Sequence, residues 1–291
     1  MKTDVTFAGI DAELATFERA EILLQSIPYD GTSTWGKGAN QGFEAFLEAA
    51  ENMELYDIET NSEVYQKGIH ILPSITEDQS PEAMYEAVLK STRKVLQYGK
   101  YPTFFGGEHS ISIGLIQAFK EKYDELSVLQ IDAHADLRKE YLGTPYNHAC
   151  AVHWASQHTD LWQVGIRSMD SSELAFVDRD KCYFAEEIVG QTDWMVESVE
   201  GMAHDNVYLT IDLDAFDPAI MPATGTPEPG GLDWNTVLTY LNLVFKKKNV
   251  VGFDIVELAP IAGLKAPQFL AAKLYYKLLS YKFYGKARTN Y

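Results

Sequence analysis

Two short acidic runs carry the residues with the clearest chemistry in this chain. Residues 132–136 read DAHAD and residues 212–214 read DLD, and each run follows an apolar, β-branched stretch. Residues i and i+2 share one face of a strand, so the polar side chains of each run are expected to project together. Converging carboxylates repel one another unless cations neutralise them. The simplest physical solution is a pair of divalent metals at the ends of neighbouring strands.

Two further stretches add to this candidate site. In GGEHS, residues 106–110, two glycines permit a tight turn before His109 at the start of a helix, and Glu257 follows an apolar run. The candidate ligands share imidazole or carboxylate donors: His109, Asp132, His134, Asp136, Asp212 and Asp214. Such a set suits Mn²⁺, with Mg²⁺, Fe²⁺ or Co²⁺ as alternatives. Two metals about 3.5–4 Å apart share a hydroxide and prepare a nucleophile at neutral pH.

Structural roles compete with this interpretation at several positions. A lone aspartate at a strand end usually caps a helix or forms a turn; that role is favoured for Asp217, and both roles stay open for Asp254. A purely structural role for the combined DxHxD and DxD pattern is disfavoured, because so many polar groups would be costly to bury without a ligand. An EF-hand is excluded at 212–214, since its glycine and bidentate glutamate are missing. Cys150 is expected to be buried near the site. The other histidines are expected at or near the surface: His70, His153, His158 and His204.

The composition limits the class of protein. The chain has 291 residues and a net charge of −18, which argues against nucleic acid as a partner and mildly favours a cationic substrate. With only Cys150 and Cys182, no disulfide framework is expected and a cytoplasmic setting is favoured. No membrane partner is expected either, because no stretch approaches roughly eighteen consecutive apolar residues and the N-terminus lacks a signal-peptide pattern.

The apolar periodicity predicts alternating strands and helices. Strands are expected at 20–28, 101–106, 127–132, 161–166, 206–212 and 249–256. Helices are expected at 43–53, 81–98, 110–123, 148–157, 234–247 and 267–281. Residues 29–42 form a long Gly-rich loop of a kind that is often functional, and residues 54–80 give no clear pattern. This alternation predicts an α/β fold with a parallel sheet covered on both faces, in which ligands bind beyond the carboxyl ends of the strands.

Together the motifs resemble those of the ureohydrolase (arginase/agmatinase) family. They occur in the family's order, with all ligand positions filled: PYDGTS at 28–33, GGEHS at 106–110, DAHADLR at 132–138, DLDAFDPAIMPATGTPEPGGL at 212–232 and VELAP at 256–260. The resemblance implies a single domain over residues 1–291, a three-layer α/β/α sandwich with a central eight-stranded parallel sheet. It also implies two Mn²⁺ per chain and hydrolysis of a guanidino group by a hydroxide that bridges the metals.

The resemblance further implies a role for each site residue. One metal is expected on His109, Asp132, Asp136 and Asp212, and the other on Asp132, His134, Asp212 and Asp214. Asp132 and Asp212 would therefore bridge the metals, and Asp136 would also pass a proton from the hydroxide to the leaving amine. His148 falls where the family keeps a proton-shuttling histidine. Glu257 falls where a carboxylate pairs with the guanidinium, and Thr226 lines the same pocket.

Departures from the arginase pattern favour agmatine as the substrate. Loop 137–147 lacks the Asn- and Ser-containing pattern by which arginases bind the α-carboxylate of arginine, and residues 35–40 replace a more arginine-rich segment. Hydrolysis of agmatine to putrescine and urea is the expected reaction, with guanidinobutyrate or arginine as alternative substrates. Two other classes of protein are disfavoured. A metal-dependent deacylase would typically lack the second metal site, and a silent member acting only in assembly should have lost ligands. Related enzymes form trimers and hexamers, so a homo-oligomer is expected.

Overall fold

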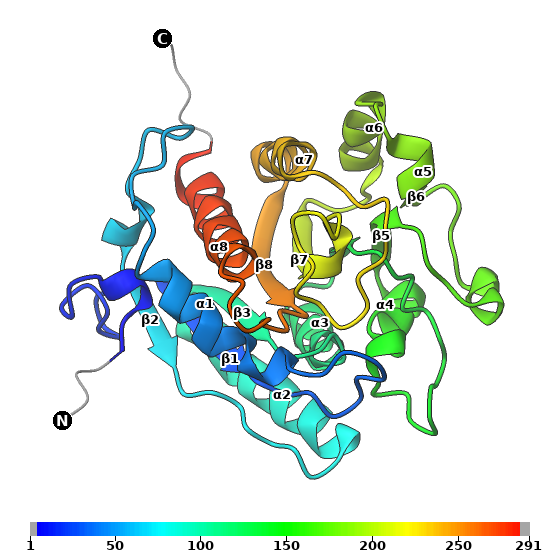
Figure 1. Cartoon of the computed structure of the whole chain (residues 1–291), viewed down its shortest axis with the longest axis horizontal. Coiled ribbons are helices and arrows are strands. Elements are labelled where there is room, and N and C mark those ends of the chain that lie inside the picture. The colour runs from blue at the N-terminus through cyan, green and yellow to red at the C-terminus, as the bar shows by residue number, and fades with distance from the viewer. Residues whose placement is uncertain (1–4, 286–291) are drawn as a thin grey trace.

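One eight-stranded sheet organises the molecule (Figure 1). The computed structural model describes residues 5–285. The strand order is β2-β1-β3-β8-β7-β4-β5-β6, and all pairings are parallel. The strands are β1 (Ile22–Ile27), β2 (Ile69–Leu72), β3 (Tyr101–Gly106), β4 (Ser127–Ile131), β5 (Asp160–Ile166), β6 (Cys182–Phe184), β7 (Asn206–Asp212) and β8 (Asn249–Val256). The prediction of an eight-stranded parallel sheet is confirmed.

Helices cover both faces of this sheet. They are α1 (Gly42–Ala50), α2 (Pro81–Val95), α3 (Ile111–Lys122), α4 (His153–His158), α5 (Ala185–Ile188), α6 (Asp193–Gly201), α7 (Trp234–Lys247) and α8 (Ala266–Tyr284). Helices α1, α6, α7 and α8 pack on one face around residues such as Phe46 and Tyr275. Helices α2, α3 and α4 pack on the other around Phe119 and Ala155. Among the described residues, no helix has the length and apolar character needed to cross a membrane. The α/β/α sandwich is confirmed.

Local sequence signals explain where the main helices begin. The Ser80 hydroxyl accepts a hydrogen bond from the Ala83 N–H, and Pro81 occupies the first turn of α2. The Asp233 carboxylate caps α7 in the same way, by accepting from the backbone N–H groups of Asn235 and Thr236. Strands β4 and β5 are buried along their whole length, which is why their sequences are largely apolar runs rather than alternating patterns.

The prediction missed two strands, β2 and β6, and two short helices, α5 and α6, and one expected helix is broken. The edge strands β2 and β6 were not predicted, because strands of four and three residues are too short to show a pattern. The expected helix 148–157 is broken into a 3-10 turn, His148–Cys150, followed by α4. The Asn147 side chain accepts from the Ala149 N–H and so starts this separate turn. All these differences lie outside the central strands that position the site.

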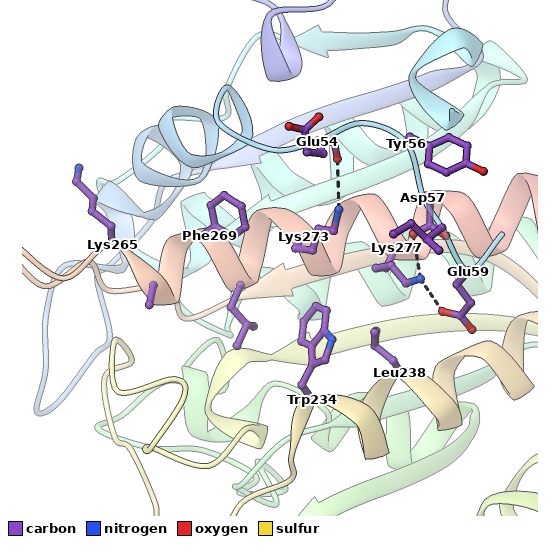
Figure 2. Close-up of a pocket in the computed structure, with 13 residues that line it drawn as sticks. Glu54, Tyr56, Asp57, Glu59, Trp234, Leu238, Lys265, Phe269, Lys273 and Lys277 are labelled. Atoms are coloured by element: carbon purple, nitrogen blue, oxygen red, sulfur yellow. Dashed lines mark hydrogen bonds and ion pairs between the residues drawn. The ribbon is translucent and has the colours of Figure 1, made fainter. Parts of the chain in front are cut away.

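A cavity of about 940 Å³ lies between α7, α8 and residues 54–59 (Figure 2). Its apolar wall includes Trp234, Leu238 and Phe269. Three of its charged lining residues are paired with each other: the Lys277 ammonium lies 2.9 Å from a carboxylate oxygen of Asp57 and 2.5 Å from one of Glu59. None of the predicted site residues lines this cavity.

Candidate metal centre and active site

The sheet order brings the predicted site residues to one place. Strands β3, β8, β7 and β4 are consecutive neighbours, so their carboxyl ends form one continuous edge. His109 follows β3, Asp132 follows β4, Asp212 ends β7 and Glu257 follows β8. In a parallel sheet covered on both faces, this edge is where ligands bind.

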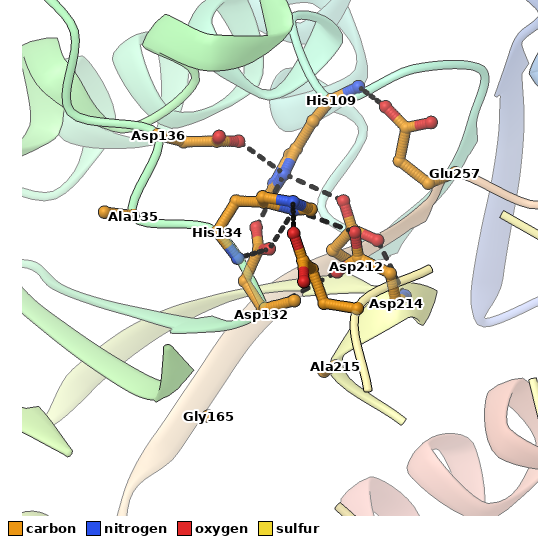
Figure 3. Close-up of polar contacts among 12 residues, drawn as sticks. His109, Asp132, His134, Ala135, Asp136, Gly165, Asp212, Asp214, Ala215 and Glu257 are labelled. Atoms are coloured by element: carbon orange, nitrogen blue, oxygen red, sulfur yellow. Dashed lines mark hydrogen bonds and ion pairs between the residues drawn. The ribbon is translucent and has the colours of Figure 1, made fainter. Parts of the chain in front are cut away.

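Two clusters of ligand-type side chains lie at this edge (Figure 3). Within each cluster, one ligand atom from each residue lies within 4.8 Å of the others: His109 with Asp132 and Asp212, and Asp132 with His134 and Asp214. Asp132 belongs to both clusters. Asp136 joins the first, because its Oδ2 lies 3.1 Å from His109 Nδ1. All the predicted ligands are therefore close together.

Short turns, rather than the strand pleat, bring the polar side chains of each run together. Strand β4 ends at Ile131 and β7 at Asp212, so the later ligands lie beyond the strands. The Asp132 carboxylate accepts from the His134 N–H at 2.6 Å, and the Asp212 carboxylate accepts from the Asp214 N–H at 2.8 Å. Such turns bend the backbone around the first carboxylate. Asp136 follows with a φ of +52°, a strained conformation of the kind often found at functional sites.

A buried ring nitrogen indicates that the first cluster fits a cation. His109 Nδ1 lies 3.0, 3.1 and 3.4 Å from carboxylate oxygens of three aspartates, which are Asp132, Asp136 and Asp212. His109 is buried, yet its Nδ1 forms no hydrogen bond. A buried nitrogen surrounded by carboxylates and left without a hydrogen bond is satisfied by a divalent cation. The donor set holds no thiolate, which suits hard cations.

A chain of buried hydrogen bonds determines which nitrogen His109 offers. The Thr210 hydroxyl donates to Asp254 Oδ1 at 2.7 Å and lies 2.9 Å from His109 Nε2. Because a hydroxyl has one proton, Thr210 must accept from His109 Nε2–H, which leaves the lone pair on Nδ1. The other Asp254 oxygen accepts from the Tyr208 hydroxyl at 2.6 Å. Asp254, whose role the sequence left open, thus lies directly behind the site.

Excess negative charge strongly shifts the pKa values in the site. Burial alone lowers the pKa of His134, but Asp214, 2.9 Å from its Nδ1, and the neighbouring aspartates raise that pKa to about 11. Burial and the negative charge of Asp132 raise the pKa of Asp136 to about 7. The clustered carboxylates contribute to both shifts, since they need protons or cations to neutralise them.

Glu257 lies beside the first cluster. Its φ is +68°, and its Oε1 accepts from the His109 backbone N–H at 2.8 Å. Burial and the nearby charge of Glu108 raise the pKa of Glu257 well above its ordinary value. A buried carboxylate of this kind gains most from a cationic partner, and the planar fork of a guanidinium matches it geometrically.

One cavity of about 280 Å³ joins these groups. It is lined by nearly all the predicted site residues: His109, His134, Asp136, His148, Asp212, Asp214, Thr226 and Glu257. Asp132 lies beneath the cavity, fully buried. Thr34 also lines the cavity, so the Gly-rich loop 29–42 borders the pocket. Cys150 is buried nearby, and burial followed by the charge of Asp136 raises its pKa to about 12.

Residues given structural roles lie outside the clusters. The Asp217 carboxylate accepts hydrogen bonds from the N–H groups of Ala219, Gly230 and Gly231, and so forms a turn as expected. The ring nitrogens of His70 and His153 lie 2.8 Å from backbone carbonyl oxygens. Neither histidine belongs to a candidate metal group among the described residues.

Sequence reasoning missed several residues that support the site. Thr210 contacts His109 and is held by Asp254, while Thr32 contacts His148 and is held by Glu108. Glu108 could have been found from the sequence. It directly precedes the predicted ligand His109, and a glutamate is rarely buried unless it has a role. Thr32 offered none, because its partners are 76 and 116 residues away in the sequence.

Comparison with known proteins gives the family. The model of the arginase family matches residues 20–280. The chain belongs to the arginase family. It is 34% identical over 279 residues to an N(1)-aminopropylagmatine ureohydrolase of Synechocystis, covering 92% of this chain and 91% of the relative. An agmatinase of Pyrococcus horikoshii is 29% identical over 94% of this chain and 97% of its own.

Solved structures of arginase-family proteins agree with this assignment. The agmatine ureohydrolase of Thermoplasma volcanium superposes with a TM-score of 0.85 at 28% identity, covering 97% of this chain and 95% of that one. The predicted family and fold are therefore confirmed. The prediction that the chain is a ureohydrolase is also confirmed, because the family match and both relatives agree with it.

Proposed function

We propose that this arginase-family chain hydrolyses agmatine to putrescine and urea with two Mn²⁺ ions. The observation that supports this most is that two ligand clusters share Asp132 and open, with Glu257, into one cavity. His109 and Asp136 would serve one ion and His134 and Asp214 the other, while Asp132 and Asp212 would serve both. Bound there, the ions lower the pKa of a water molecule and so supply a nucleophile at neutral pH.

Glu257 binds the guanidinium in this proposal. Its Oε1 is held by the His109 N–H at 2.8 Å, so the carboxylate has a fixed orientation in the cavity. A guanidinium donates two parallel N–H groups to a carboxylate, which places its central carbon in one defined position. The charge pairing also offsets the desolvation that raises the pKa of Glu257. Thr226 lines the same cavity and limits where the substrate can lie.

Asp136 and His148 move protons. Asp136 lies beside the first cluster and passes a proton from the attacking water to the leaving amine. Burial lowers the pKa of His148 to about 4, and the positive charge of His134 acts in the same direction. Cations in the clusters would have the same effect. His148 is therefore neutral at neutral pH and able to accept a proton.

A second candidate substrate is N(1)-aminopropylagmatine. Relatives from Synechocystis and Thermus thermophilus, each 34% identical to this chain, carry the name of that activity. This compound keeps the guanidinium and adds an aminopropyl group, so Glu257 would bind it in the same way. The Asp170 side chain, 41% exposed beside the cavity, offers a carboxylate for an additional amine.

Urea release with agmatine, N(1)-aminopropylagmatine and arginine in the presence of Mn²⁺ tests the proposal. We expect kcat/KM for agmatine to exceed that for arginine. A higher kcat/KM for N(1)-aminopropylagmatine than for agmatine would replace the substrate and leave the chemistry unchanged. Absence of urea with every guanidino compound, at full metal occupancy, would contradict the proposal.

The proposal extends to the form of the protein. We place it in the cytoplasm as a homo-oligomer, with residues 1–291 forming one domain. Large apolar side chains exposed around the larger cavity, such as Ile58 and Phe269, support self-association. Sedimentation at several concentrations would show a stable trimer or hexamer, and a monomer throughout would contradict this part.

A further inference from the structure

We infer that Thr32 and Glu108 form a positioning pair that fixes the tautomer of His148 and leaves its Nε2 free to accept a proton. The inference deepens the proposed function, since it rests on His148 being the proton carrier. It assigns a task to two residues of distant segments, the Gly-rich loop 29–42 and the turn after β3.

The Thr32 hydroxyl is the centre of this arrangement. Its Oγ1 donates to Glu108 Oε1 at 2.8 Å. The same oxygen accepts from the His148 backbone N–H at 3.0 Å and lies 3.1 Å from His148 Nδ1. A hydroxyl has one proton and two lone pairs. Once the proton is directed to Glu108, the contact with Nδ1 requires a proton on Nδ1.

Glu108 is held as an acceptor by its surroundings. The residue is fully buried. Its Oε1 also accepts from the Thr32 N–H at 3.2 Å, and its Oε2 accepts from the Ser110 N–H at 2.8 Å. Backbone N–H groups can only donate, so both carboxylate oxygens face fixed donors. The Thr32 hydroxyl is therefore directed toward Glu108 and not toward the histidine.

The position of His148 makes this tautomer matter. Its ring lines the cavity together with Glu257 and the predicted ligands. With Nδ1 directed at Thr32, the nitrogen on the opposite side of the ring, Nε2, has no hydrogen bond to any residue in the described part of the chain. Protonated on Nδ1, the neutral ring presents a lone pair at Nε2, whereas the other tautomer would present an N–H that cannot take up a proton.

A purely structural role for Thr32 makes a different prediction. The Thr32 backbone N–H also bonds to Glu108, and this contact anchors the loop without the hydroxyl. Thr32→Val keeps the shape of the side chain and this backbone bond but removes the hydroxyl. Thr32→Ser keeps the hydroxyl and removes a methyl group. If Thr32 only anchors the loop, Val should be tolerated at least as well as Ser.

The kinetic test compares both variants with His148→Ala and the double variant T32V/H148A, using agmatine and saturating Mn²⁺. Loss of a residue that orients a ligand or base typically lowers activity about 10–100-fold. We expect this loss in kcat for Thr32→Val, with KM little changed, and a loss below about threefold for Thr32→Ser. In the His148→Ala background, Thr32→Val should have no further effect on kcat. An equal loss in both backgrounds, an equal loss in Thr32→Ser, or no loss in Thr32→Val would overturn the inference.

A spectroscopic test is independent of catalysis. Nitrogen chemical shifts of the His148 ring, measured with ¹⁵N-labelled histidine on protein loaded with diamagnetic Mg²⁺, distinguish the two neutral tautomers, and the His148→Ala spectrum assigns the signals. We expect the proton on Nδ1 in the wild type and a mixed population in Thr32→Val. A wild-type proton on Nε2 would overturn the inference. If no guanidino compound is hydrolysed but the Nδ1 tautomer is found, the proposed function fails while the positioning role stands.

Discussion

At the scale of residues, the two clusters predict that substitutions of His109 and of Asp132 affect metal binding differently. His109 belongs to one candidate group, whereas Asp132 belongs to both. We expect His109→Ala to lower the occupancy of one metal more than the other, and Asp132→Ala to lower both. Anomalous scattering from Mn²⁺ in crystals of each variant measures the two occupancies separately. Equal loss of both metals in His109→Ala would argue against this assignment.

Asp254 provides a second prediction at this scale. It is fully buried and accepts from the hydroxyls of Thr210, Tyr208 and Ser112. Asp254→Asn places an amide beside those donors, which weakens the hold of Thr210 on His109. We expect Mn²⁺ affinity to fall about 10–100-fold, as is usual when a group that orients a ligand is lost.

Metal titration calorimetry of Asp254→Asn, alongside Thr210→Val, provides the measurement. Both variants interrupt the same hydrogen-bond chain and should weaken binding in the same direction. The thermal unfolding of each metal-free variant controls for general damage to the fold. Wild-type affinity in both variants would show that this chain does not orient His109.

Metal binding should also release protons. The pKa of His134 in the metal-free protein is about 11, so its ring is protonated at neutral pH and must lose a proton to bind a metal. Calorimetry at pH 7 in buffers of different ionisation enthalpy should show this release, and Mn²⁺ affinity should rise with pH. An uptake of protons, or no exchange at all, would contradict the ligand role of His134.

The same pKa shift gives a prediction for stability. The folded-state pKa of His134 is raised above the ordinary value of 6.5, so protonation of its ring stabilises the metal-free fold. This contribution is complete below pH 6.5 and is lost as the pH rises through about 11. Chemical unfolding of the chelated protein across this range should therefore show falling stability in alkali. In His134→Gln, which lacks the titrating ring, this part of the decline should disappear.

At the scale of elements, α8 is fixed to residues 57–59 by a buried ammonium. Lys277 lies 2.9 Å from Asp57 and 2.5 Å from Glu59, and Lys277 and Asp57 are buried. Removing one partner of a buried ion pair typically costs about 3–5 kcal/mol. We expect Lys277→Met to lose about 3 kcal/mol in urea unfolding. Lys273→Met, at a partly buried lysine of the same helix whose ammonium donates to the Glu54 carbonyl oxygen, should change stability by less than about 0.5 kcal/mol.

The Lys277 effect should depend on pH. Burial would raise the pKa values of Asp57 and Glu59, but hydrogen bonds, chiefly from Lys277, outweigh it and lower both. The two ionised carboxylates therefore stabilise the fold at pH values above their ordinary pKa values of 3.8 and 4.5. This stability is lost as the pH falls through their lowered pKa values. The difference between wild type and Lys277→Met should shrink below about pH 4. A difference that stays constant in acid would contradict the ion-pair explanation.

Sequence patterns predicted the elements to different degrees. The six central strands and the caps at Ser80 and Asp233 were predictable because they are long apolar runs or local hydrogen-bonding motifs. The edge strands β2 and β6 were not, since few residues define them and pairing on one side suffices to form them. The ligands were found because each follows a strand. Thr32 and Asp254, which support His148 and His109, were not identified as such, because their hydrogen bonds join segments far apart in the sequence.

At the scale of the whole molecule, substrate choice depends on the cavity and its surroundings. Arg138, in loop 137–147, lines the cavity, and its guanidinium already lies 3.5 Å from the Asp170 carboxylate. The α-carboxylate of arginine would compete with Asp170 in an acidic surround, whereas agmatine has no such group. We expect kcat/KM for agmatine to exceed that for arginine at least about tenfold, or about 1.4 kcal/mol. Preference for arginine would show that the loop does provide a carboxylate site.

The most direct measurement of the central claim is urea release from agmatine by protein stripped of metal and then reloaded with Mn²⁺. The stripped protein, shown metal-free by elemental analysis, should release no urea, and activity should return as two Mn²⁺ bind per chain. Asp132→Asn should stay inactive on reloading, while Asp217→Asn, a carboxylate in a structural turn, should recover. Full turnover by the metal-free protein, or undiminished turnover by Asp132→Asn, would contradict the metal-dependent hydrolysis proposed for this site.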